Sequence, residues 1–288
     1  MQKRLYLKNV LLSLSLCLLT GCTKNIVLVV PTAPTQITVE GHVEPGKLAY
    51  LYLSTNFSFF GNISITNILK NNVIHNAVVT INDGTTIDTM KEFIPEIGYY
   101  QSVSMTGQIG KTYALDVKAI GQEAKATTTI LQPIPLDSVW FQVQPNKDTL
   151  GFIWATLTSP LPPGHNYRWM AQRIGEDTTY IPPPFSVFND QFIYGQTIKF
   201  AYQRGILPGS KAADDTNAER GYFKIGENIS VKFCTIDNTA YTFYNTMYAQ
   251  QANGENPFAA STPVVGNVQG GQGIWCGYGV SYKTVICK

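Results

Sequence analysis

The amino-acid sequence predicts a mostly β protein: an immunoglobulin-like β-sandwich, followed by a second β-rich domain that contains one helix. Three observations carry this prediction. Charged residues make up only 14% of the 288-residue chain, while Tyr, Thr, Val, Ile, Asn and Gly are plentiful, as in half-buried strands joined by tight turns. Short alternating segments, separated by turn residues, recur from residue 37 onward. One longer segment, 239–253, has helical spacing instead.

The first domain is expected over residues 37–132. Seven short segments alternate apolar and polar residues, with turn signals about every 8 to 12 residues, which favours an immunoglobulin-like sandwich. Asn82-Asp83-Gly84 is a strong hairpin signal, and residues 54–72 are expected to form a long loop with part of a strand. The expected strands are 37–41, 49–53, 77–81, 85–88, 99–103, 113–119 and 124–131.

The second domain is expected over residues 133–288. Pro133 and Pro135 mark the boundary, because a strand ladder cannot run through two prolines this close together. A further run of three prolines, 182–184, has to lie in a loop or at a sheet edge.

The clearest strand of the second domain is 228–235. Its apolar residues alternate with Ser230, Lys232 and Cys234, so one face is expected to be apolar and the other polar. The last segment, 266–287, is expected to form a kinked pair of strands. The other strands expected here are 136–143, 150–157, 167–173 and 192–200.

The helix near 239–253 can be capped by Asp237 or Asn238. Four large side chains fall at helical spacing on one face, and this stripe is expected to pack against a sheet. The stripe consists of Tyr241, Tyr244, Met247 and Tyr248.

Residues 1–21 have the pattern of a secretory signal. Basic residues precede an apolar stretch of roughly residues 10–19, and small residues follow it. The run Leu19-Thr20-Gly21-Cys22 resembles a bacterial lipoprotein signal, which implies cleavage before Cys22 and acylation of its thiol and amine. Residues 22–36 are then a short tether to the membrane. An uncleaved anchor and a plain secretory signal are the alternatives.

The net charge argues against a nucleic-acid partner, and the cysteines allow two structural interpretations. The chain has 21 basic and 19 acidic residues. Three of the basic residues lie in the signal, so 18 remain against 19, and no positive excess supports nucleic-acid binding. Cys234, Cys276 and Cys287 are either small buried apolar residues, or Cys276 and Cys287 bridge neighbouring strands.

Motifs for catalysis or metal binding are missing from the sequence. The three histidines, His42, His75 and His165, are far apart and lack ligand spacing. No Gly-x-Ser-x-Gly elbow and no phosphate-binding glycine loop occurs. We therefore expect a protein that is not an enzyme and has no catalytic residue, metal or cofactor.

Aromatic residues in loops are the remaining candidates for contact with a ligand or partner, because loops on a rigid β scaffold commonly carry recognition. Phe57, Phe59 and Phe60 lie in a polar loop without a core pattern. Tyr180 and Phe185 flank the proline run of the second domain and are the next choice.

Several motifs resemble a family of Bacteroidetes envelope lipoproteins whose genes commonly neighbour TonB-dependent outer-membrane receptors. The most specific are Asn256-Pro257-Phe258 and the segment from Gly270 to Tyr278. Trp275-Cys276 departs from the family, which more often has Phe and a small residue there. The glycines of this segment suit a bulged strand under close backbone approach.

The resemblance implies an outer-membrane lipoprotein, lipid-anchored through Cys22. Its expected role is that of a non-catalytic accessory or ligand-binding partner of a TonB-dependent transporter. A surface glycan hydrolase and a structural or adhesive module are the alternatives. The sequence leaves open whether the protein faces the periplasm or the cell surface.

Overall fold

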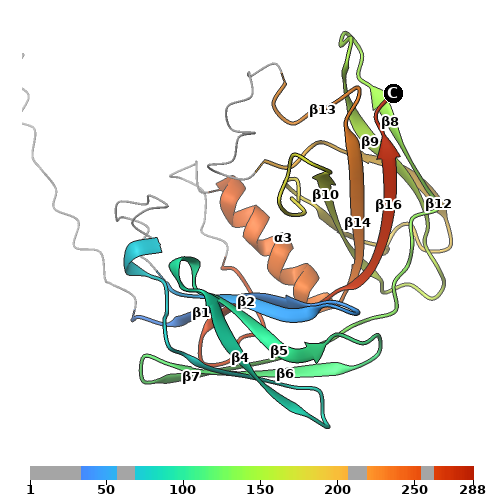
Figure 1. Ribbon diagram of the computed structural model, residues 1–288. Coiled ribbons are helices and arrows are strands. Elements are labelled where there is room, and N and C mark those ends of the chain that lie inside the picture. Colours follow the sequence, from blue (N-terminus) through green and yellow to red (C-terminus); the bar gives the residue numbers. More distant parts are fainter. Residues whose placement is uncertain (1–33, 57–68, 207–218, 254–262) are drawn as a thin grey trace, which may run out of the picture. The chain divides into compact units, whose positions relative to one another are not determined.

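The computed structural model describes residues 34–56, 69–206, 219–253 and 263–288. The mostly β prediction is confirmed, and residues Thr35–Lys288 form one compact unit (Figure 1). The domain boundary predicted at Pro133 stays a prediction. Among the described residues, no helix is both long enough and apolar enough to span a bilayer.

All seven strands expected before residue 132 are present, and they form the first sheet with one strand from near the C-terminus. The order across this sheet is β15-β1-β2-β5-β4-β3-β6-β7. The strands are β1 (Ile37–Val43), β2 (Leu48–Thr55), β3 (Val78–Asn82), β4 (Ile87–Ile94), β5 (Tyr99–Thr106), β6 (Thr112–Ala119), β7 (Gln122–Thr129) and β15 (Gln272–Gly277).

The first sheet folds back so that its two end strands approach each other around one core. Lys125 on β7 and Gln269 just before β15 exchange backbone hydrogen bonds of 2.9 and 2.8 Å. Trp275 of β15 is fully buried in this core, and its Nε1 donates to the carbonyl of Tyr113 over 3.1 Å. The sheet formed by the strands of residues 37–132 therefore also contains a strand that the sequence analysis assigned to the second domain.

A glycine permits the parallel pairing of β15 with β1. Gly273 has φ +104°, and a Cβ there would lie 1.9 Å from the carbonyl oxygen of Val39. The close backbone approach expected for this glycine-rich segment is confirmed.

The remaining strands form two four-stranded sheets. The second sheet has the order β11-β10-β14-β16, and in the third sheet β9 pairs with β8, β12 and β13. A core between the two sheets buries Ile153, Trp169 and Phe233, among others. The strands are β8 (Ser138–Val143), β9 (Leu150–Thr158), β10 (Asn166–Arg173), β11 (Val187–Asn189), β12 (Thr197–Tyr202), β13 (Phe223–Lys224), β14 (Asn228–Ile236) and β16 (Gly279–Ile286).

Two expectations for these strands need correction. β12 begins at Thr197 rather than at residue 192, because the preceding residues form a turn in which Tyr194 N–H bonds the carbonyl of Asp190 over 2.9 Å. β14 alternates as expected, but its polar face is buried as well, because β14 is an inner strand and other elements cover that face.

The helix α3 (Asn238–Asn253) is capped by Asp237, whose Oδ1 accepts from the backbone N–H of Ala240 over 2.7 Å. Tyr244 and Tyr248 are buried, and the packing expected for the aromatic stripe is confirmed. The helix contacts β10 and β11 of the second sheet and β15 of the first.

The C-terminal strands pass from one sheet to another. β15 pairs with β1 in the first sheet, whereas β16 pairs with β14 in the second. Tyr278 is the single residue between them and is buried. The expected kink is present, but the two strands do not pair with each other, because each completes a different sheet.

The three downstream cysteines are free and buried, which favours their role as small apolar residues. Burial raises the pKa of Cys234 and of Cys287 to about 12, so both stay thiols at neutral pH. The alternative bridge between Cys276 and Cys287 is not formed.

Candidate functional site

A cavity of about 430 Å³ lies between the first and second sheets, and we call it the interlayer cavity. Strands β1 and β2 line one side, and β10 and β14 line the other. The segment 178–182 and α3 complete the lining. Its charged and aromatic lining residues include Glu40, His42, Glu44, Lys47, Tyr50, Tyr52, Arg168, Tyr180, Lys232, Tyr244 and Tyr278.

Strand alternation explains why these side chains meet. On β1, Val39 and Val43 enter the core of the first sheet, so His42 points to the opposite face. On β10, Trp169 enters the core between the second and third sheets, and its neighbour Arg168 points into the cavity. The cavity is thus built from the faces of two sheets that point away from their own cores.

Glu44 is the centre of a buried ion cluster. Its Oε1 accepts from His42 Nε2 over 2.9 Å and from the ammonium of Lys232. Its Oε2 accepts from Tyr282 Oη over 3.2 Å and lies 3.2 Å from Lys47 Nζ. Both carboxylate oxygens are therefore already engaged by hydrogen-bond donors.

The protonation states of this cluster follow from burial and pairing. Burial alone would raise the pKa of Glu44, but the hydrogen bond from His42 and the charge of Lys232 outweigh it and hold that pKa well below its ordinary value. Burial lowers the pKa of His42 to about 4, although its hydrogen bond to Glu44 opposes the shift. At neutral pH the cavity therefore holds a carboxylate and a neutral imidazole.

Arg168 is the second buried cation of the cavity, with 7% of its surface exposed. Its Nη1 donates to the hydroxyl of Tyr278, and its Cζ lies 3.5 Å from the ring centre of Tyr244. The Nε atom has no hydrogen-bond partner, and no carboxylate of the described residues forms an ion pair with the guanidinium. Burial raises the pKa of Tyr244 and Tyr278, so both hydroxyls stay protonated.

Tyrosines line the cavity from several elements. The rings of Tyr50 and Tyr52 lie 6.1 Å apart on β2. Tyr180 lies near β14 and β16, where its hydroxyl is 2.9 Å from Ser230 Oγ and its ring is 5.8 Å from that of Tyr282. These rings give the cavity flat, amphipathic walls.

Of the contact residues expected from the sequence, only some lie at the interlayer cavity. Tyr180 lines the interlayer cavity. Phe185 does not line it: its side chain is 57% exposed and its ring lies 5.6 Å from that of Tyr248. Phe57, Phe59 and Phe60 lie outside the described residues. Their contact role, like that of Tyr180 and Phe185, stays a prediction.

The other two histidines each have a carboxylate partner. His75 Nδ1 is 2.7 Å from Glu92 Oε1 at the surface. His165 Nδ1 lies 2.8 Å from Oδ2 of the buried Asp190. Asp190 also accepts from the backbone of Gly164 over 2.8 Å, so this carboxylate holds the turn together. Within the described residues, no group of His, Cys, Asp and Glu could hold a metal ion.

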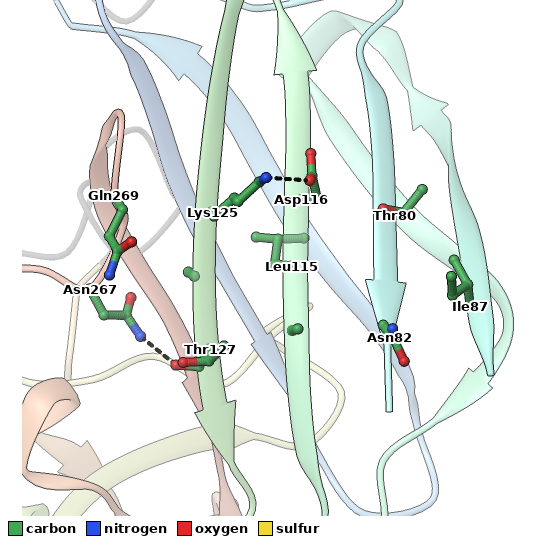
Figure 2. A pocket seen from close by; sticks show the side chains of 11 residues that line it. Thr80, Asn82, Ile87, Leu115, Asp116, Lys125, Thr127, Asn267 and Gln269 are labelled. Carbon is green, nitrogen blue, oxygen red and sulfur yellow. Dashed lines mark hydrogen bonds and ion pairs between the residues drawn. The ribbon is translucent and has the colours of Figure 1, made fainter. Parts of the chain in front are cut away.

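A second hollow of about 390 Å³ lies across β3, β6 and β7, as Figure 2 shows. Its polar groups are paired with one another: Lys125 Nζ is 3.4 Å from Asp116, and Asn267 Nδ2 donates to the carbonyl of Thr127 over 3.0 Å. Because the interlayer cavity alone of these two contains buried charges, we take it as the candidate site.

Sequence reasoning missed the residues that make this site, namely Glu44, Arg168, Lys232 and Tyr278. One signal was available. Arg168 and Lys232 each stand within a strand whose neighbouring residues are mostly apolar or aromatic, and such charged residues are rarely buried without a specific partner.

In a comparison with known protein families, a single family model matches nearly the whole chain. The protein-family model described as "Domain of unknown function (DUF4249)" matches residues 23–284. The chain belongs to the DUF4249 family. The match includes every residue of the interlayer cavity and both of the most specific sequence motifs. A search of curated proteins finds no match to the chain.

Proposed function

We propose that this DUF4249 protein is an outer-membrane lipoprotein that binds a ligand without transforming it and serves as an accessory of a TonB-dependent transporter. The observation that carries the binding role is the interlayer cavity. Its volume of about 430 Å³ falls within the range of small-molecule sites, roughly 300–1,000 Å³. Five tyrosines line it, and aromatic side chains are common in the walls of such sites.

Binding is favoured over catalysis by the state of Glu44 and Tyr278. A general base needs a free lone pair within reach of the substrate. Both oxygens of Glu44 already accept from neighbouring donors, and Tyr278 is a buried phenol with a raised pKa. These groups are fixed in pairs that shape and charge the cavity.

The membrane placement rests on the sequence. Leu19-Thr20-Gly21-Cys22 and the basic and apolar stretches before it support acylation at Cys22. Two or more acyl chains give stable anchoring, where one chain gives only reversible binding. The transporter partnership rests on the resemblance to envelope lipoproteins encoded beside TonB-dependent receptors.

Native mass spectrometry of the protein extracted from its own membranes tests the binding role. We expect a complex with a small molecule that denaturation releases chemically intact, and an acylated Cys22 in the same spectrum. A protein that carries no small molecule and hydrolyses an oligosaccharide library would instead favour the glycan hydrolase, in which Glu40 and Glu44 of the cavity would be the acid pair to test.

A further inference from the structure

The charges of the interlayer cavity do not balance. Two buried cations, Arg168 and Lys232, line the cavity together with one buried carboxylate, Glu44. Lys47 at the rim also pairs with Glu44. Glu40 lines the wall from an exposed position and forms no ion pair with these cations within the described part of the chain. Among the described residues, one of the two buried positive charges therefore has no counterion.

This uncompensated charge belongs to Arg168. Lys232 contacts Glu44 directly, whereas the partners of Arg168 are the hydroxyl of Tyr278 and the ring of Tyr244. A guanidinium has five N–H donors, and here Nε has no acceptor among the described residues. Burying a charged group without a counterion or full hydrogen bonding is costly, so an arrangement of this kind is more typical of a binding site than of a core.

The geometry of the guanidinium defines the chemistry of its partner. Its planar fork matches a carboxylate or phosphate through two parallel hydrogen bonds. The nearby charge of Glu44 would repel a dianion more strongly than a monoanion. The tyrosine walls can accommodate a flat ring or a sugar beside the charged group. A singly charged carboxylate therefore fits the cavity better than a phosphate does.

We propose that the interlayer cavity binds a small organic carboxylate and that Arg168 is the residue that recognises its charge. This inference rests on the proposed ligand-binding role and adds the class of ligand. Tyr244 and Tyr278 are then positioning residues, because they hold the plane of the guanidinium from its face and from one edge.

Titration calorimetry of the purified full-length lipoprotein in detergent tests the proposal. The probes are glucuronate and benzoate, each with a neutral counterpart of similar size, glucose and benzamide, and inorganic phosphate. We expect at least one carboxylate to bind, and to bind at least about tenfold more tightly than its neutral counterpart and than phosphate. If neither carboxylate does so, the proposal is overturned. Tighter binding of phosphate would also overturn it.

Variants of Arg168 assign the effect to this residue. Arg168→Met is expected to weaken carboxylate binding by at least about tenfold, whereas Arg220→Met, the same change at an exposed position, leaves it unchanged. Arg168→Lys keeps a buried cation but loses the planar fork, so this variant replaces Arg168→Met in the test if Arg168→Met does not fold. We expect Arg168→Lys also to bind the carboxylate at least about tenfold more weakly. Unchanged binding in a folded Arg168 variant would contradict the assignment.

The proposed ligand-binding role and the proposed carboxylate ligand can fail separately. Native mass spectrometry that finds a bound neutral molecule would keep the binding role and overturn the carboxylate. A protein that binds no small molecule at all would overturn both.

Discussion

At the scale of single residues, the ion cluster around Glu44 determines the charge of the interlayer cavity. Glu44 follows β1 of the first sheet and Lys232 lies on β14 of the second, 188 residues apart in sequence, yet both are buried and in direct contact. Removing one member of a buried ion pair leaves the other charge uncompensated, which costs far more than the loss of a surface pair.

We therefore expect Glu44→Gln to lower the free energy of unfolding by about 3–5 kcal/mol, because Lys232 stays buried without its counterion. Glu123→Gln is the matched control, since Glu123 pairs with the exposed Lys118 and Lys125, and it should cost no more than about 1 kcal/mol. Urea denaturation measures both. Equal small losses would mean that the buried cluster contributes no more than a surface pair.

His42 predicts a dependence of stability on pH. The unfolded chain takes up a proton here near pH 6.5, but the folded chain does so only near pH 4. Between these values the unfolded state binds more protons, so the free energy of unfolding falls as the pH drops, by about 3 kcal/mol in all. The lowered pKa of Glu44 adds to this fall only at lower pH, below its ordinary value of 4.5.

Urea midpoints measured between pH 7 and 4.5 separate these contributions. His42→Gln should remove most of the fall in stability, because the amide can still donate to Glu44 but takes up no proton. His75→Gln, at a ring that is 47% exposed, should leave the fall in place. An unchanged pH profile in His42→Gln would contradict the assignment to His42.

The role of a residue could be predicted from the sequence only where it depends on residues that are close in the sequence. Asp237 as a helix cap and the buried stripe of α3 were predictable, because both depend on spacing within a few residues. Tyr180 was named from its proline loop and does line the cavity. Glu44 and Arg168 were not predictable as a site, because their environment depends on how separate sheets pack.

At the scale of elements, β15 is the strand that joins the parts of the fold. Its alternate residues enter two cores: Trp275 lies in the core of the first sheet, while Ile274 and Cys276 pack with α3. The seven strands before residue 132 were predictable from their alternation and turns. The pairing of β15 with β1 was not, because strand partners distant in sequence leave no local pattern.

Gly273→Ala tests the junction between β15 and β1. We expect a loss of at least about 2 kcal/mol in the free energy of unfolding, because the new Cβ would both strain a left-handed backbone and collide with the carbonyl oxygen of Val39. Gly84→Ala is the control: it has φ +90° but open space around it, so it should cost about 1 kcal/mol. Equal losses in thermal or urea unfolding would show that the close approach is unimportant.

At the scale of the whole molecule, the fold is less divisible than the proline boundary suggests. A fragment of residues 36–132 lacks β15, so it exposes the edge of β1 and leaves the space of Trp275 empty. We expect it to unfold at a lower urea concentration than the full chain, or without cooperativity. A fragment with the same midpoint as the full chain would indicate an independent sandwich domain.

We propose for this DUF4249 protein the role of a lipid-anchored, ligand-binding accessory of a TonB-dependent transporter. Affinity purification of the tagged protein from native membranes, followed by mass spectrometry of the co-purified proteins, tests it most directly. We predict that a TonB-dependent outer-membrane receptor co-purifies with the acylated protein and is lost with Cys22→Ser, which cannot be anchored. Recovery of an acylated protein without any such receptor would contradict the claim.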